Sequence, residues 1–133
     1  MAFRDFADVT RYIGGIFQQA YLDPELAPRL TAHDLVLQFT FTEPDTVLVV
    51  DFAAGEVHEG PSALVPHVTM TMSADTGNAY WQGKVNLPMA MARSRIAVEG
   101  NVATMLKVAP LGKKLFPQYV ETLRADGRDD LLV

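Results

Sequence analysis

The hydropathy pattern of this chain changes its period twice, and this change limits the folds open to it. Large apolar side chains occupy every second position over residues 35–42, which is typical of a half-buried β-strand. Residues 47–52, 56–59 and 68–72 predict three further strands, and Glu43-Pro44-Asp45 predicts the turn between the first two. Because short turns join the first three strands, we expect them to form an antiparallel meander.

An amphipathic helix is predicted before the strands, over about residues 6–22, with Asp5 as its N-cap. Its apolar side chains recur at spacings of three and four residues, at Phe6, Val9, Ile13, Ile16 and Ala20. This spacing places them on one helical face, which is expected to pack on the sheet.

After the fourth strand the chain becomes helical again. Ser73 and Asn86 are the predicted N-caps of two short helices. A fifth strand is expected from Arg93 to Glu99. The helix after it is expected to be interrupted by Pro110, and a last helical segment covers residues 111–124.

Strands in the middle and helices at both ends predict an α+β fold. The expected architecture is a five-stranded, largely antiparallel sheet covered on one face by about five helices. The 133 residues suit a single domain, since domains most often contain roughly 100–150 residues. The charged stretch 126–133 is expected to be a mobile tail.

Composition excludes several classes of protein. Apolar residues make up 49% and charged residues 20% of the chain, which is a globular and not a disordered composition. The net charge of −5 argues against a nucleic-acid partner, which needs a basic surface. No apolar run approaches the length of a membrane span, and Asp5 and Asp8 interrupt the N-terminus where a signal peptide would be apolar. We therefore expect a soluble, cytoplasmic protein.

The chain has no recognisable catalytic or metal-binding motif. His33, His58 and His67 lack the spacing of a zinc-binding pair, and the chain contains no cysteine. No serine lies in a Gly-x-Ser-x-Gly elbow, and no glycine-rich phosphate loop is present. We expect neither catalysis nor a metal or other cofactor.

Methionine is unusually concentrated. Five of the six methionines fall between residues 70 and 105, at predicted core-facing positions. Methionine is flexible and polarizable, so it either fills irregular gaps in a core or lines an adaptable binding surface. The pattern alone leaves both interpretations open.

Four stretches of the chain follow one another in a distinctive order. They are Val68–Ser73, Gly83–Asn86, Ile96–Asn101 and Leu106–Val108. In this order they resemble the sterol carrier protein type 2 family of nonspecific lipid-transfer domains. The signature of that family is a strand, a helix, Gly-Lys-x-Asn-Pro, a strand, Gly-Asn and an amphipathic helix with a lysine. The resemblance covers roughly residues 6–124.

The resemblance implies a hydrophobic cavity between the sheet and the helices, which holds a fatty acid, acyl-CoA, sterol or other hydrophobic ligand without catalysis. The chain also departs from the family pattern. Gly77-Asn78 replaces a bulky apolar pair, and Met91-Ala92 replaces an aromatic pair. Arg93-Ser94 is found where the family has Gln-Gly. The Asn-Pro pair of the family is divided here, because Leu87 separates Asn86 from Pro88. These changes remove bulk and add a charge near the expected cavity.

The predicted ligand-binding residues combine inward-facing positions with the resemblance. The cavity is expected to be lined by Phe39, Phe41, Val50, Met70, Met72, Trp81, Met89, Met91, Ile96, Met105 and Leu106. Phe116, Tyr119 and Val120 belong to the segment 111–123, which either opens the cavity or simply completes the core. Arg93 either binds a fatty-acid carboxylate or is a solvated surface residue.

Two functions remain open from the sequence. The first is a small lipid carrier with a fatty acid, acyl-CoA, sterol-like or isoprenoid ligand and transient membrane contact. The alternative is an accessory module that docks to an enzyme of lipid, quinone or related metabolism, as domains resembling this one also do.

Overall fold

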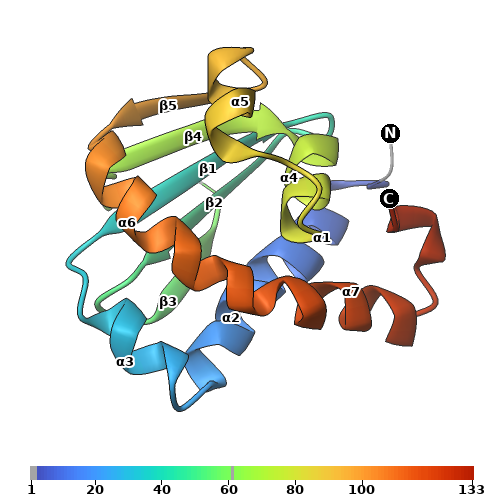
Figure 1. The fold of residues 1–133 in the computed structure, drawn as a ribbon, viewed down its shortest axis with the longest axis horizontal. Coiled ribbons are helices and arrows are strands. Elements are labelled where there is room, and N and C mark those ends of the chain that lie inside the picture. The colour runs from blue at the N-terminus through green and yellow to red at the C-terminus, as the bar shows by residue number, and fades with distance from the viewer. Residues whose placement is uncertain (1–2, 61) are drawn as a thin grey trace.

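The computed structural model describes residues 3–60 and 62–133, and its centre is a five-stranded sheet in the order β3-β2-β1-β4-β5 (Figure 1). The strands are β1 (Val36–Thr42), β2 (Thr46–Asp51), β3 (Glu56–Glu59), β4 (Val68–Ser73) and β5 (Ile96–Gly100). Strand β1 pairs with β4 in parallel, and the other three pairings are antiparallel. The predicted meander and the largely antiparallel sheet are therefore confirmed.

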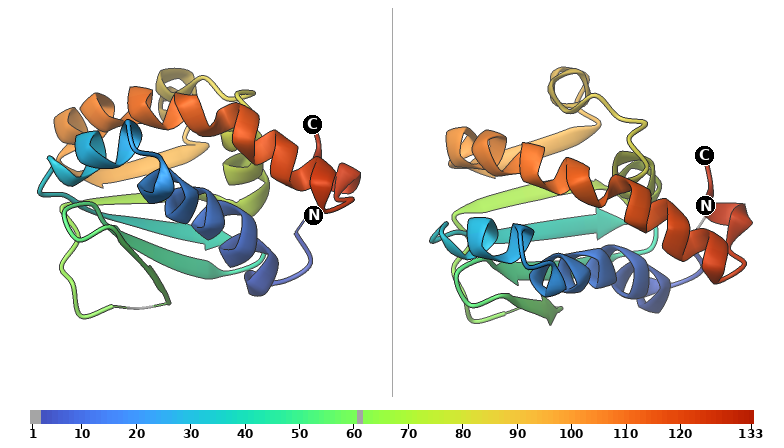
Figure 2. Two further views of the ribbon diagram at one scale, coloured as in Figure 1. Left: turned by 90° about the horizontal axis from the view of Figure 1, so that it is seen from below. Right: turned by 60° about the horizontal axis from the view of Figure 1, so that its bottom comes forward.

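One face of the sheet is apolar, and the helices cover that face (Figure 2). Phe39 lies opposite Leu48 on one side and Met70 on the other, and all three are buried. The alternate residues Thr40 and Thr71 belong to the other face and retain solvent exposure. The period-two pattern of the sequence thus decides which face is covered.

The first helical segment runs through α1 (Phe6–Val9), a π-helical turn (Thr10–Gly14) and α2 (Gly15–Leu22). The Asp5 side chain accepts a hydrogen bond from the Asp8 amide at 3.0 Å, which confirms the predicted N-cap. Phe6 was expected in the core, and this expectation is wrong: its side chain is 63% exposed. The residues that α1 buries are Asp8 and Val9 instead.

The remaining helical elements follow in chain order. They are α3 (Leu26–Thr31), α4 (Ala74–Trp81), α5 (Leu87–Ala92), α6 (Val102–Gly112), a 3-10 turn (Lys113–Leu115), α7 (Phe116–Ala125) and a second 3-10 turn (Asp129–Leu131). The side chains of Ser73 and Asn86 each accept a hydrogen bond from a helical amide at 3.1 Å, and both predicted N-caps are thereby confirmed.

Two expected boundaries are wrong. Helix α6 continues through Pro110 to Gly112. Proline removes one hydrogen bond from a helix, but Pro110 and Leu106 are both exposed, so the freed carbonyl of Leu106 has access to water. Strand β5 begins at Ile96 and not at Arg93, because the Arg93 amide donates a hydrogen bond to the Met89 carbonyl at 3.0 Å and caps α5.

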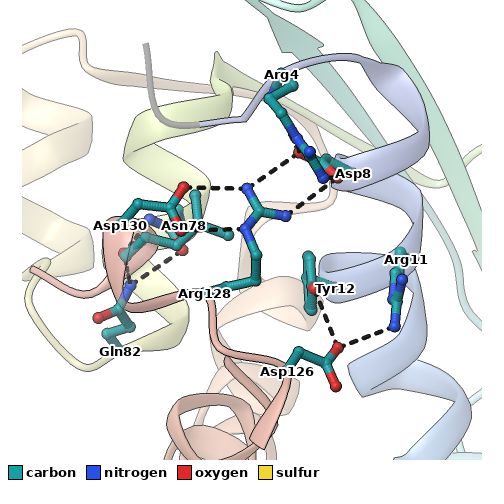
Figure 3. A network of polar contacts seen from close by, with 10 residues as sticks. Arg4, Asp8, Arg11, Tyr12, Asn78, Gln82, Asp126, Arg128 and Asp130 are labelled. Carbon is teal, nitrogen blue, oxygen red and sulfur yellow. Dashed lines mark hydrogen bonds and ion pairs between the residues drawn. The ribbon is translucent and has the colours of Figure 1, made fainter. Parts of the chain in front are cut away.

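The C-terminal segment packs against the domain, which differs from the expected mobile tail. Leu131 is fully buried, and its carbonyl accepts hydrogen bonds of 2.8 Å from Asn78 and from Gln82 (Figure 3). Arg128 donates hydrogen bonds to Asp8 at 3.2–3.3 Å and so joins this segment to the first helix. Two of the charges that suggested a tail, Asp126 and Arg128, thus form ion pairs with Arg11 and Asp8 in the body of the protein.

Candidate functional site

An apolar pocket of about 60 Å³ lies between the sheet and the helices. The sheet and the residue after β2 contribute Leu37, Phe39, Phe41, Phe52, Met70 and Met72. The N-terminal helices contribute Phe17, Ala20 and Leu30, and α4 and α5 contribute Gly77, Tyr80, Trp81 and Leu87. Helix α6 and the turn after it contribute Met105, Val108, Ala109, Leu111, Gly112 and Leu115.

The pocket lining is chemically uniform. None of its side chains is charged, and Tyr80 supplies its single hydroxyl. Burial raises the pKa of the Tyr80 hydroxyl, so the tyrosine is neutral at physiological pH. A charged group has no counter-charge here, and its burial is costly. The part of a ligand that enters this pocket is therefore hydrocarbon.

Trp81 is the centre of an aromatic cluster at the wall formed by α4. Its ring meets those of Phe17, Tyr80 and Phe116 edge to face, at centroid distances of 5.2, 5.5 and 5.9 Å. Tyr119 lies next to it at 6.5 Å. Edge-to-face rings stabilise one another beyond the area they bury, so this wall is well defined.

Glycine at position 77 makes room for the sheet side of the pocket. A Cβ atom there would lie 2.7 Å from a ring carbon of Phe41 and 3.2 Å from the side chain of Ile13. The absent side chain lets the Phe41 ring approach α4 and stack with Phe39 at 5.9 Å. The lack of a side chain at position 77 therefore makes room for the Phe41 ring and also adds space to the pocket.

The predicted cavity residues fall into three groups. Six of them line the pocket: Phe39, Phe41, Met70, Met72, Trp81 and Met105. Six lie outside the lining while buried or partly buried: Val50, Met91, Ile96, Phe116, Tyr119 and Val120. The remaining three, Met89, Arg93 and Leu106, are exposed.

The inward orientation expected for two residues is wrong. Met89 is 48% exposed, because the short helix α5 buries Leu87 and Ala90 instead. Leu106 is 45% exposed, since its neighbour Met105 takes the inward position on α6. Arg93 is exposed at the end of α5 and does not line the pocket, so its role as a carboxylate partner stays a prediction.

Most of the wall made by α6 was not among the predicted cavity residues. Val108, Gly112 and Leu115 follow Met105 at spacings of three and four residues and share its face. This periodicity was a usable signal, but the expected break at Pro110 concealed it. Leu30 carried no such signal, because it lies between the predicted helix and the first predicted strand. Phe52 ends the predicted strand 47–52, which is apolar on both faces except at Asp51, so alternation does not show which of its side chains point inward.

A buried polar cluster lies behind the aromatic wall. Tyr119 donates a hydrogen bond to the Asn78 side-chain oxygen at 2.7 Å. Gln82 donates to the same oxygen at 3.0 Å (Figure 3). Burial raises the pKa of Tyr119. These bonds, with those to the Leu131 carbonyl, fix α4 and α7 to the C-terminal segment.

Charged residues beside this cluster form a second network. The hydrogen bonds from Arg4, assisted by Arg128, hold the pKa of Asp8 well below its usual range. Tyr12 and Arg11 both donate to Asp126, at 3.0 and 3.1 Å (Figure 3). Within residues 3–60 and 62–133, no group of His, Asp and Glu is arranged to hold a metal ion, and no helix has the length and apolarity to cross a membrane.

Comparison with known proteins gives the family. Residues 15–113 match the SCP-2 sterol transfer family, and the chain belongs to that family. No curated protein sequence matches it.

Solved structures share the fold. Sterol carrier protein domain 2 of Helicoverpa armigera is 20% identical, with 82% of this chain and 88% of that one covered and a TM-score of 0.68. Palmitated SCP2L2 from Aedes aegypti is 22% identical, with 78% and 93% covered and a TM-score of 0.61. The UbiJ-SCP2 ubiquinone synthesis protein is 19% identical, with 86% and 95% covered and a TM-score of 0.62.

Proposed function

We propose that this protein is a lipid carrier that encloses the hydrocarbon part of one ligand in the pocket between the sheet and α6, without catalysis. The observation that carries the proposal is the uncharged, apolar lining of the pocket. The structure of a palmitated relative supports a single fatty acyl chain as the first ligand to test.

Ligand binding requires the pocket to enlarge. Its volume of about 60 Å³ is well below the roughly 150 Å³ of an engineered apolar cavity that accepts benzene. Three of the lining residues are methionines, whose unbranched side chains change rotamer more readily than branched ones. We therefore propose that the methionines are adaptable lining rather than simple filling of the core.

We propose that the C-terminal segment 111–123 is the part that opens. Leu111, Gly112 and Leu115 line the pocket, and Phe116 packs on Trp81 from the same segment. The 3-10 turn Lys113–Leu115 separates α6 from α7 at this point and breaks the regular helical hydrogen bonding. Movement at this turn uncovers the pocket without disturbing the sheet.

A pair of matched variants on α6 tests the carrier function. Ala109 lines the pocket, whereas Ala103 is exposed on the same helix. We expect Ala109→Phe to lower the affinity for palmitate at least tenfold, measured by displacement of a fluorescent fatty acid, and Ala103→Phe to leave it unchanged. Equal palmitate affinity in both variants and the parent would contradict the proposal.

The similarity to the UbiJ-SCP2 ubiquinone synthesis protein favours one alternative, an accessory module for an enzyme. Native mass spectrometry of the protein as isolated separates the two functions. A retained lipid supports the carrier, and an empty pocket with a co-purifying enzyme supports the accessory role.

A further inference from the structure

The charges of this acidic chain are unevenly distributed. Residues 84–114 contain six Lys and Arg and one acid, Glu99, which is a net charge of +5. The rest of the chain contains five Lys and Arg and fifteen Asp and Glu, which is a net charge of −10. The basic stretch comprises α5, β5 and α6. Strand β5 is an edge strand with α5 beside it, and α6 begins at that edge and runs across the covered face of the sheet (Figure 1). The overall charge of −5 conceals this basic region.

Helix α6 and the turn after it divide cleanly into two faces. One face lines the pocket through residues that include Met105, Val108 and Leu115. The opposite face, here termed the basic face, is exposed throughout and consists of Ala103, Leu106, Lys107, Pro110, Lys113 and Lys114. A single helix therefore separates the pocket from a surface that is cationic and partly apolar.

We propose that the basic face docks on the surface of an anionic phospholipid bilayer. Lysine ammonium groups are attracted to anionic headgroups, and an exposed leucine among them can enter the boundary between headgroups and acyl chains. Leu106 has that position, since it is 45% exposed next to Lys107. The proposal deepens and rests on the carrier function, because it places the pocket wall against the source of the lipid.

The structure favours a bilayer over other anionic partners. Nucleic-acid recognition uses basic groups with polar or aromatic side chains that contact bases, whereas Leu106, Pro110 and Ala103 supply aliphatic surface only. The remaining charge of −10 is repelled by an anionic surface, so it orients the molecule with the basic face toward the bilayer. Docking of this kind is weak and salt-dependent, which suits a carrier that must leave the membrane.

Vesicle co-sedimentation tests the proposal. The vesicles are phosphatidylcholine alone, or phosphatidylcholine with about one third phosphatidylglycerol. We expect the parent protein to bind the anionic vesicles at 50 mM salt and to be released at 500 mM salt. The Lys107→Gln/Lys113→Gln/Lys114→Gln variant should show a partition coefficient roughly 100-fold lower, equivalent to about 1 kcal/mol for each lysine.

A control variant changes the net charge by the same amount elsewhere. Gln18 and Arg124 are exposed on α2 and α7, and Gln18→Glu/Arg124→Glu also lowers the net charge by three. We expect this control to keep most of the vesicle binding. Equal losses in the control and the lysine variant, or equal binding to neutral and anionic vesicles, would overturn the proposal.

The carrier function and the docking proposal fail in different ways. Palmitate affinity in solution, without vesicles, tests the pocket alone. It should be unchanged in the single variant Lys107→Gln, because Lys107 lies outside the pocket lining and outside the turn Lys113–Leu115. If the parent binds palmitate but not anionic vesicles at low salt, the docking proposal is overturned and an acidic protein becomes the candidate partner. If it binds anionic vesicles through the three lysines but not palmitate, the docking proposal holds and the carrier function fails.

Discussion

The hydrogen bond from Tyr119 to Asn78 is expected to couple α7 to α4 strongly enough to be measured. Both side chains are almost fully buried, at 1% exposure, and the two oxygens lie 2.7 Å apart. A buried hydroxyl that loses its acceptor costs about 1–3 kcal/mol, whereas removal of the hydroxyl itself costs less. This asymmetry gives the two single variants different expected effects.

We expect Tyr119→Phe to lower the free energy of unfolding by about 1 kcal/mol, because Asn78 still accepts a hydrogen bond from Gln82. Asn78→Ala should lower it by about 2–4 kcal/mol, since it leaves the Tyr119 hydroxyl without its acceptor and creates a small cavity. In the Asn78→Ala background the Tyr119→Phe substitution removes an orphaned group. It should therefore cost nothing there, or stabilise the protein.

Urea unfolding of the parent, both single variants and the double variant measures this cycle. The expected coupling energy is about 1–2 kcal/mol, which is well above the error of such measurements. Effects that add to within about 0.3 kcal/mol would refute the argument, because they would mean that the two side chains do not share a buried hydrogen bond. The exposed variant Gln18→Ala on α2 serves as a control that should be neutral.

Three further predictions concern the charge network, the pocket and its opening. The lowered pKa of Asp8 means that its contribution to stability is present above the ordinary carboxyl pKa of 3.8 and is lost as the pH falls through the lower folded value. Asp8→Asn should thus destabilise by about 1 kcal/mol at pH 7 and by much less at pH 2 in urea unfolding. Gly77→Ala should cost about 1–3 kcal/mol in the same assay and lower palmitate affinity, because its Cβ displaces the Phe41 ring. Hydrogen exchange of residues 111–123 should slow with bound palmitate more than exchange of the strands, and equal protection would leave that segment a purely structural role.

The sheet could be predicted because its signals are local. Alternation over residues 35–42 determines both the strand and the face that it buries, and side-chain caps such as Ser73 mark where a helix begins. Six of the predicted cavity residues line the pocket. Five of them were predicted for the same reason, because they lie on strands or helices whose apolar residues recur at a clear spacing. The parallel pairing of β1 with β4 carried no such signal, because it depends on a crossover between distant strands.

The remainder could not be predicted because it depends on contacts between distant segments. The packing of Leu131 requires Asn78 and Gln82, which lie about 50 residues earlier in the chain. The short helix α5 has two candidate apolar faces, and only its position beside β5 turns Met89 outward. Pro110 is a local signal, but exposure to water on the outer side of α6 outweighs it.

Helix α6 forms one wall of the small pocket and also bears the basic face, and the energy of ligand binding connects the two roles. Burial of a C16 chain provides a gross stabilisation of about 12 kcal/mol, at ~0.8 kcal/mol for each of about 15 methylene or methyl groups, and the losses on association are of similar size. A pocket of about 60 Å³ adds the energy of opening to those losses. Helix α6 supplies one wall of the pocket through Met105 and Val108, and its opposite face carries Leu106 and the lysines. The proposed docking of that face therefore brings the adjoining segment 111–123, which is proposed to open, to the place where the lipid is available.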